Sequence, residues 1–206
     1  MPKDFETRLR AALSSPGPRR VSLDDARDAA VLIPFVGGGE PSLIFTVRTE
    51  TLPSHKGQIS FPGGSVDPDE ETQQTALRET FEELAVDPSS VRILGELDSV
   101  PTFVSGYVVH PVVGWLDELP ELVPNESEVA DVLLVPLAEL SDDIWSAPGF
   151  THAGRTYPTE AWIWRDRVIW GVTARILRLL LIRLARAGLA SAPAAADPWT
   201  VPTGTP

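Results

Sequence analysis

The order of apolar segments along the chain is the feature that most constrains its fold. Apolar runs of strand length dominate the first two thirds, whereas helical periodicity is confined to a few segments. Strands are predicted at 29–35, 42–48, 91–100, 107–116 and 129–135, and a partly alternating stretch spans 160–170. Helices are predicted at 5–13, at 71–84 and after residue 170. Strands mixed with few helices predict a layered α/β or α+β domain.

A length of 206 residues, 43% of them hydrophobic, fits one domain with a sizeable core. A Ser/Pro/Gly break at 14–18 separates the first short helix from the rest of the chain, so residues 1–24 are interpreted as a leader. The domain itself is expected to span residues 25–189. Residues 190–206 are rich in Ala, Pro and Thr and are expected to form a disordered tail.

The charge of the chain excludes several classes of partner. A net charge of −12 argues against nucleic acid and against an anionic membrane surface. No Lys or Arg occurs between Arg92 and Arg155. An acidic chain of this kind can still bind a phosphate substrate if a divalent metal and a few well-placed cations assist it.

Two further absences narrow the chemistry. The chain has no cysteine, which excludes disulfides, zinc–thiolate sites and a cysteine nucleophile and suits a cytoplasmic location. The most apolar run, 168–189, contains four arginines and is therefore expected to be a docked amphipathic helix, with no membrane partner.

The segment 71–84 concentrates carboxylates. At 100° per residue, Leu77, Phe81 and Leu84 are expected to face the core, and Glu79, Glu82 and Glu83 to share the opposite face. Three like charges at this spacing repel one another, and a solvated acidic face is the simplest explanation for them. A hard divalent cation would also relieve the repulsion, since Mg²⁺ prefers carboxylate, water and phosphate oxygens.

The residues around this segment favour the metal. Gly63 and Gly64 follow a predicted strand and allow backbone to approach a metal or phosphate closely. Arg78 can hold the carboxylates beside it in place.

This region resembles the Nudix box, the signature of Nudix hydrolases. The positions that match in register are Gly64, Glu70, Arg78, Glu79, Glu82, Glu83 and Val86. Two positions depart: Thr80 replaces an aliphatic residue and Ala85 replaces a glycine. The resemblance implies an α/β/α Nudix fold, a mixed sheet between helices. It also implies that Glu79, Glu82, Glu83 and the Gly63 carbonyl hold Mg²⁺, or Mn²⁺, and that Glu70 braces the loop through Arg78.

The stretch before the box is similar to the signature of coenzyme A diphosphatases. Arg48, Gly57 and the run 61–64 match that signature, and Pro53 stands where a second arginine is usual. The expected substrate-binding residues are Arg48, His55, Lys56 and Gly64. Stretches 124–130 and 169–177 also resemble this subfamily, and Glu128 is expected to be a further metal ligand or the base that activates water. Trp162, Trp164 and Trp170 are interpreted as core residues in preference to an adenine-stacking platform.

The resemblance implies Mg²⁺-dependent cleavage of coenzyme A to 3′,5′-ADP and 4′-phosphopantetheine, with Arg78, Glu82, Glu83 and Glu128 in the catalytic machinery. One alternative is a pyrophosphatase for ADP-ribose, another nucleoside diphosphate derivative or a (d)NTP, which the Pro53 departure keeps open. A second alternative is a non-catalytic, nucleotide-binding regulator, against which the intact glutamate set argues. The expected partner is a small nucleotide; the oligomeric state stays open, a homodimer included.

Overall fold

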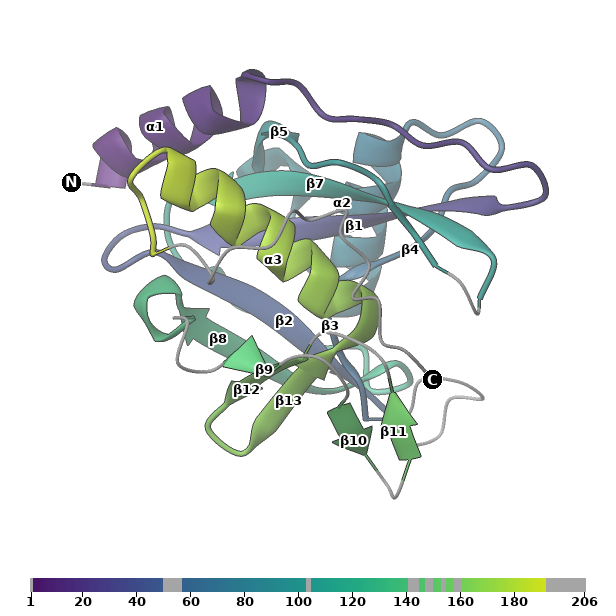
Figure 1. Cartoon of the computed structure of the whole chain (residues 1–206). Helices are drawn as coiled ribbons and strands as arrows, with labels where there is room; N and C mark the ends of the chain where they lie inside the picture. The colour runs from purple at the N-terminus through teal and green to yellow at the C-terminus, as the bar shows by residue number, and fades with distance from the viewer. Residues whose placement is uncertain are drawn as a thin grey trace.

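The computed structural model describes residues 2–49, 57–102, 105–140, 145–146, 150–152, 155–157 and 161–191. A mixed sheet of eight strands forms its centre (Figure 1). The strands are β1 (Arg27–Val36), β2 (Ser42–Arg48), β3 (Ile59–Ser60), β4 (Gly63–Ser65), β5 (Arg92–Glu96), β6 (Val100–Pro101), β7 (Tyr107–Leu116) and β8 (Val129–Pro136).

Strand β1 organises this sheet. It pairs in parallel with β7 along its whole length, from Arg27 opposite Tyr107 to Val36 opposite Leu116. Its other edge is shared: β4 pairs antiparallel with its first half, and β2 pairs antiparallel with its last residues. Strand β8 lies against β2. The splayed pairing of β1 places the glycines of β4 at the sheet edge, next to the helix that follows them.

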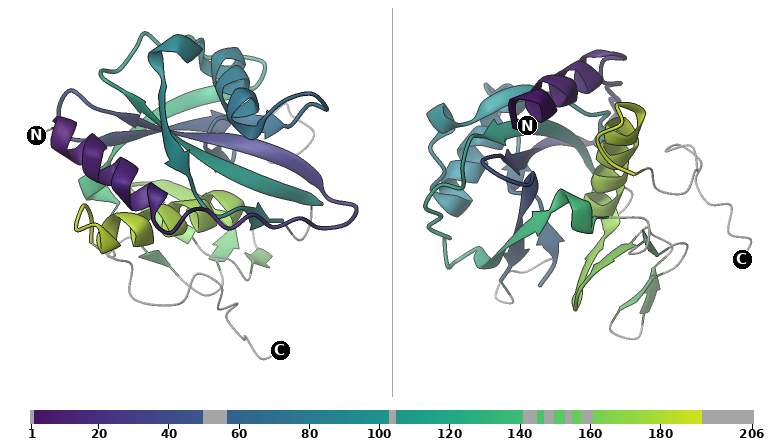
Figure 2. Two further views of the ribbon diagram at one scale, coloured as in Figure 1. Left: turned by 90° about the horizontal axis from the view of Figure 1, so that it is seen from above. Right: turned by 90° about the vertical axis from the view of Figure 1, so that its left-hand side faces the viewer.

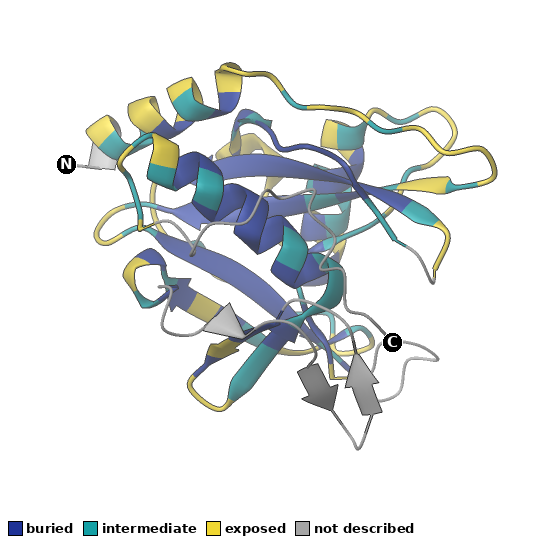
Figure 3. Ribbon diagram, in the orientation of Figure 1, coloured by how far each residue is buried: buried dark blue, intermediate teal, exposed yellow. Residues whose placement is uncertain are grey.

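Three α-helices cover the two faces of the sheet: α1 (Pro2–Ser14), α2 (Thr72–Leu84) and α3 (Gly171–Arg186). Helix α2 lies on one face, and α1 and α3 lie together on the other (Figure 2). Each face has its own buried core, one including Ala76 and Leu84 and the other including Leu9 and Leu180 (Figure 3). The predicted α/β/α layering is therefore confirmed.

Short elements complete the described chain. They are the 3₁₀ turns η1 (Pro88–Ser90) and η2 (Leu137–Glu139), the three-stranded sheet of β9 (Trp145–Ser146), β12 (Ala161–Trp164) and β13 (Arg167–Trp170), and the hairpin of β10 (Phe150–His152) and β11 (Arg155–Tyr157). Trp162 and Trp164 are buried, and the Trp162 indole donates to the Ala174 carbonyl at 3.2 Å. These two tryptophans belong to the core, as predicted.

The amino-terminal segment is tied into the fold. Leu9 and Leu13 of α1 are fully buried, because this helix packs against β5 and α3. The Arg183 guanidinium of α3 donates to the Asp98 carboxylate and to the Pro16 carbonyl. Residues that were interpreted as a leader thus supply part of the core. Residues 192–206, most of the expected tail, lie outside the described ranges.

Helix α3 is the expected docked amphipathic helix. All of its leucines are buried, and it carries arginines along its length. No helix in the described part of the chain has the length and apolar character needed to cross a membrane.

Candidate functional site

Helix α2 begins and ends through defined local chemistry. Glu71 is its N-cap, and a reciprocal capping box joins Glu71 and Gln74, with the Glu71 amide donating to Gln74 Oε1 at 2.9 Å. Ala85 ends the helix in the left-handed conformation, with φ 57°. The residue that replaces the usual glycine therefore keeps a backbone shape that favours glycine.

The buried face of α2 differs from the prediction. Phe81 is 52% exposed and Leu77 is half-buried, whereas Glu83 is only 4% exposed. The buried stripe runs through Ala76, Thr80, Glu83 and Leu84, roughly 80° around the helix from the expected one. The prediction that all three glutamates face away from the core was wrong.

The small side chains of this stripe explain its position. Ala76 and Thr80 let α2 approach β1 and β4 closely, and the Thr80 hydroxyl donates to the Ala76 carbonyl at 2.6 Å, which satisfies it inside the core. A larger aliphatic residue at Thr80 is not needed to fill this contact.

Gly63 and Gly64 allow that approach from the side of the sheet. A β-carbon at Gly64 would overlap the Glu79 carboxylate, and one at Gly63 would overlap the Ala30 carbonyl and Val31. A side chain at Gly63 would separate β4 from β1, and one at Gly64 would displace the Glu79 carboxylate. The glycines therefore bring backbone polar groups directly beside Glu79 and Glu83.

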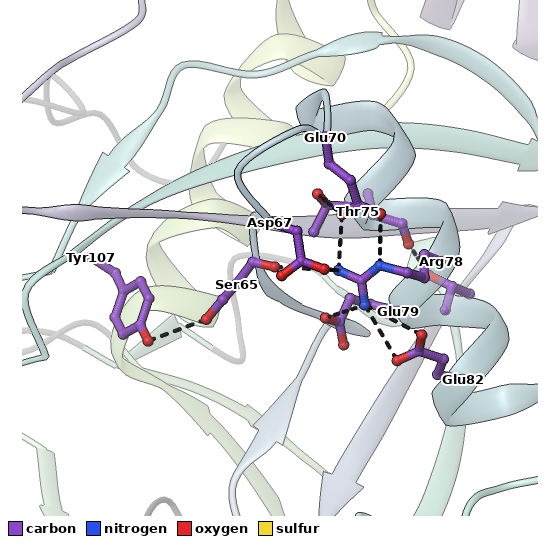
Figure 4. Close-up of polar contacts among 10 residues, drawn as sticks. Ser65, Asp67, Glu70, Thr75, Arg78, Glu79, Glu82 and Tyr107 are labelled. Carbon is purple, nitrogen blue, oxygen red and sulfur yellow. Dashed lines mark hydrogen bonds and ion pairs between the residues drawn. The ribbon is translucent and has the colours of Figure 1, made fainter.

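Arg78 is surrounded by carboxylates (Figure 4). Its Nε and Nη2 lie 2.8 and 3.0 Å from the two Glu70 oxygens, and its Nη1 lies 2.9 Å from Glu79 and 3.3 Å from Glu82. Together with a hydrogen bond from Thr75, Arg78 lowers the pKa of Glu70 to about 2. Glu70 therefore joins the loop between β4 and α2, called here the box loop, to the helix as an ionised carboxylate.

Glu83 has a different environment. Its Oε2 is buried without a hydrogen-bond partner among the described residues, and burial raises its pKa to about 8. The charge of Arg48 and a hydrogen bond from the Gly63 amide oppose that rise, whereas the charges of Glu79 and Glu128 add to it. A buried carboxylate oxygen with no partner is costly unless something binds it.

The chemistry of these donors fits a divalent cation. Glu83 offers an unsatisfied oxygen, and Glu79, whose pKa is raised mainly by burial, lies against the Gly64 backbone. Within the described ranges no three acidic or histidine side chains already converge closely enough to hold a metal, and both Glu79 and Glu82 are turned toward Arg78. The described residues thus provide oxygen ligands for a metal but do not form a complete coordination shell on their own.

Glu128 is brought to these carboxylates by main-chain hydrogen bonds. The Asn125 amide donates to the Glu83 carbonyl at 2.9 Å, and the Thr49 amide donates to the Glu128 carbonyl at 3.0 Å. The turn from Asn125 to Glu128 is therefore attached both to the end of α2 and to the end of β2. The Glu128 carboxylate lies near enough to raise the pKa of Glu79 and of Glu83.

The predicted substrate-binding residues divide into two groups. Arg48, at the end of β2, lies on the α2 side and acts electrostatically on Glu83, and its Nε has no partner in the described part of the protein. Gly64 lies beside Glu79. His55, Lys56 and Pro53 lie outside the described residues, so the predictions for them stay untested.

Some residues of the site were not predicted. Thr75 donates to Glu70 at 2.7 Å, and the Tyr107 hydroxyl lies 3.2 Å from Ser65 Oγ at the end of β4 (Figure 4). The Tyr107 contact joins positions 42 residues apart, so no local pattern could have revealed it.

Comparison with known proteins identifies the family of the chain. The NUDIX domain family matches residues 25–154. The chain is 38% identical over 179 residues to a protein of Photorhabdus laumondii described as an uncharacterized Nudix hydrolase, NudL; the match covers 86% of this chain and 94% of the relative. It is 43% identical over 143 residues to Nudix hydrolase 3 of Caenorhabditis elegans, covering 67% of this chain and 60% of the relative.

A solved structure supports the fold. The MutT/nudix family protein of Enterococcus faecalis matches with a TM-score of 0.53 at 14% identity, over 89% of this chain and 74% of that one. Nudix hydrolases generally use a divalent metal such as Mg²⁺ and act on small nucleotides. The chain belongs to the Nudix family and is a hydrolase of phosphoanhydride bonds in nucleoside diphosphate derivatives.

Proposed function

We propose that this hydrolase cleaves the diphosphate of coenzyme A, giving 3′,5′-ADP and 4′-phosphopantetheine. The observation that carries the position of the reaction is the carboxylate of Glu83, which is buried and has one oxygen without a hydrogen-bond partner among the described residues. The charge of Arg48 and a hydrogen bond from the Gly63 amide act on the same carboxylate. The choice of coenzyme A is supported by the stretch from Arg48 to Gly64, which resembles the coenzyme A diphosphatase signature.

In this proposal Glu79, Glu82 and Glu83, with the Gly63 carbonyl, hold Mg²⁺, and Mn²⁺ can replace it. A bound divalent cation would neutralise charge on the diphosphate oxygens and polarise the phosphorus between them. Arg78 keeps Glu79 and Glu82 oriented, and Glu70 keeps Arg78 in place through their two-point ion pair. The box thus provides a preorganised acidic surface for one metal-bound diphosphate.

The remaining residues act on the substrate and on water. Arg48 offsets the charge of the diphosphate, together with His55 and Lys56 of the following loop, and Gly64 lets the substrate approach β4. Glu128, beside Glu79 and Glu83, takes a proton from the water that attacks one phosphorus. The leaving phosphate departs as part of 3′,5′-ADP or of 4′-phosphopantetheine, according to which phosphorus is attacked.

A substrate panel tests the proposal. The purified protein is incubated with Mg²⁺ or Mn²⁺ and coenzyme A, ADP-ribose, diadenosine tetraphosphate or dNTPs in ¹⁸O-labelled water, and products are read by mass. We expect the highest kcat/KM for coenzyme A, and the labelled product identifies the phosphorus attacked. A higher kcat/KM for ADP-ribose or a dNTP would refute the substrate assignment and leave the reaction class intact.

A further inference from the structure

Arg27 is a cation that the proposed mechanism does not use, at the start of β1, the strand that pairs with the box glycines of β4. It stacks on Tyr107, which packs against the core on the α1 and α3 face of the sheet, opposite α2. Arg27 is exposed, and its guanidinium carbon lies 4.4 Å from the centre of the Tyr107 ring. In the described part of the chain it forms no ion pair. Of the other two arginines of this region, Arg78 bonds Glu70 and Glu79, and Arg48 is assigned to the diphosphate in the mechanism proposed above.

The pairing of β1 with β7 holds this cation in place. Arg27 and Tyr107 are direct partners in the parallel ladder, and the Arg27 amide donates to the Gly106 carbonyl at 3.0 Å. The Tyr107 amide donates to Thr102 Oγ1 at 2.8 Å. Both residues of the stacked pair are thus anchored through their backbone amides.

Tyr107 connects the pair to the box. Its hydroxyl lies 3.2 Å from Ser65 Oγ, and the Ser65 carbonyl accepts a hydrogen bond from Arg78 Nη2 at 3.4 Å (Figure 4). Gly64 is paired with Ala30, three residues beyond Arg27, which corresponds to roughly 10 Å of strand. A nucleotide whose diphosphate lies at the box can span that separation by passing Ser65, at the end of β4, to the opposite face of the sheet.

The charge of Arg27 is not cancelled by its neighbour. Asp28 points to the opposite face of β1, where it lies 2.8 Å from His110 Nε2. A guanidinium stacked on an aromatic ring keeps its N–H edge free, and that planar edge suits a phosphate group with two parallel hydrogen bonds.

We propose that Arg27, held on the Tyr107 ring, binds a phosphate monoester of the substrate outside the scissile diphosphate. For coenzyme A, and resting on the function proposed above, this group is the ribose 3′-phosphate. Arg27 therefore determines specificity and takes no part in the attack on phosphorus.

The kinetic test compares coenzyme A with dephospho-coenzyme A, which lacks only the 3′-phosphate. Arg27→Gln is expected to lower kcat/KM for coenzyme A by about ten- to a hundredfold, mainly through KM, because one charge-assisted contact is lost. The value for dephospho-coenzyme A changes less than about threefold. Arg165→Gln is the matched control: Arg165 lies 4.5 Å from the Trp164 ring, the same kind of stacking on another part of the surface. It leaves both values unchanged.

A binding test separates this inference from the proposed reaction. Calorimetry without metal compares 3′,5′-ADP with 5′-AMP on wild type, Arg27→Gln and Tyr107→Leu. Wild type should prefer 3′,5′-ADP by at least about tenfold, and both variants should lose that preference while each still unfolds in one cooperative melting transition.

If wild type fails to hydrolyse coenzyme A but shows this Arg27-dependent preference, the substrate proposal fails and the phosphate site stands. An equal loss of affinity for both nucleotides would mean that Arg27 stacks on the base, which overturns the inference. The absence of any preference in wild type overturns it as well.

Discussion

Arg78 and Glu70 form a two-point ion pair between the box loop and α2, with Nε 2.8 Å from Oε1 and Nη2 3.0 Å from Oε2. Both side chains are less than one-third exposed, so water screens this pair only partly. The same guanidinium also bonds Glu79 at 2.9 Å. The loop conformation and the position of a candidate metal ligand therefore depend on one arginine.

Because of this ion pair, the free energy of unfolding should depend on pH in the acid range. The pKa of Glu70 is lowered from 4.5 to about 2 in the folded state, so its contribution is present above pH 4.5 and is lost as the pH falls toward 2. We expect Glu70→Gln to lower the free energy of unfolding by roughly 1 kcal/mol at pH 7 and by much less near pH 2. Urea unfolding between pH 7 and pH 2 measures both differences, with the exposed Asp69→Asn as control. A difference that is independent of pH would contradict the ion-pair account.

Glu83→Gln should separate activity from stability. We expect kcat to fall by about 10²–10³ with the proposed best substrate, since a metal ligand is lost at the reacting centre. Without metal, the variant should be at least as stable as wild type at pH 7, because it lacks the carboxyl group whose pKa burial raises to about 8, a rise that costs stability above pH 4.5. Steady-state kinetics and thermal melting measure the two effects. The control is Glu118→Gln, at an exposed residue just after β7. Activity within a few-fold of wild type would remove Glu83 from the metal site.

Ala85→Gly should stabilise the protein. Ala85 is exposed and has φ 57°, a conformation that costs a residue with a β-carbon about 1 kcal/mol or more. Part of this gain is offset by the greater flexibility of glycine in the unfolded chain, so we expect a net increase of about 0.5 kcal/mol. Ala76→Gly, in the buried middle of the same helix, should instead destabilise by about 1 kcal/mol. Both are measured by denaturant unfolding, and a loss of stability in Ala85→Gly would be inconsistent with the left-handed cap.

The orientation of α2 can be tested by replacing one leucine and one phenylalanine of the helix with alanine. Leu84 is fully buried, so Leu84→Ala should cost about 2–5 kcal/mol. Phe81 is 52% exposed, so Phe81→Ala should cost less than about 1 kcal/mol. Chemical unfolding of the two variants ranks them directly. Equal losses would favour the helix face expected from periodicity over the observed one.

The amino-terminal helix should contribute to global stability. Leu9 is fully buried against α3 and the sheet, so Leu9→Ala should lower the free energy of unfolding by about 2–5 kcal/mol. Leu23→Ala is the matched control, since Leu23 is 47% exposed and should lose less than about 1 kcal/mol. Calorimetry of both variants tests this difference. A separate melting transition for α1, with the rest of the domain unaffected, would show that the helix does not contribute to the stability of the domain.

Local patterns in the sequence were enough to predict the long strands β1, β2, β7 and β8, the helix that carries Glu79 and the matching positions of the box. Strand and helix periodicity is a property of neighbouring residues, and the box is a continuous motif from Gly64 to Val86. The layered fold followed from the order of these elements, and the NUDIX family match covers the same region.

Contacts between distant segments could not be predicted in this way. Periodicity ranked Phe81 as core, but the close approach of β4 to α2 at Gly64 decides which side of the helix is covered, and it buries Glu83. The opposition of Arg27 and Tyr107 exists only because β1 and β7 pair in parallel, 80 residues apart in the chain. Burial of a carboxylate and stacking of a cation both depend on which surfaces meet, and only the tertiary structure determines that.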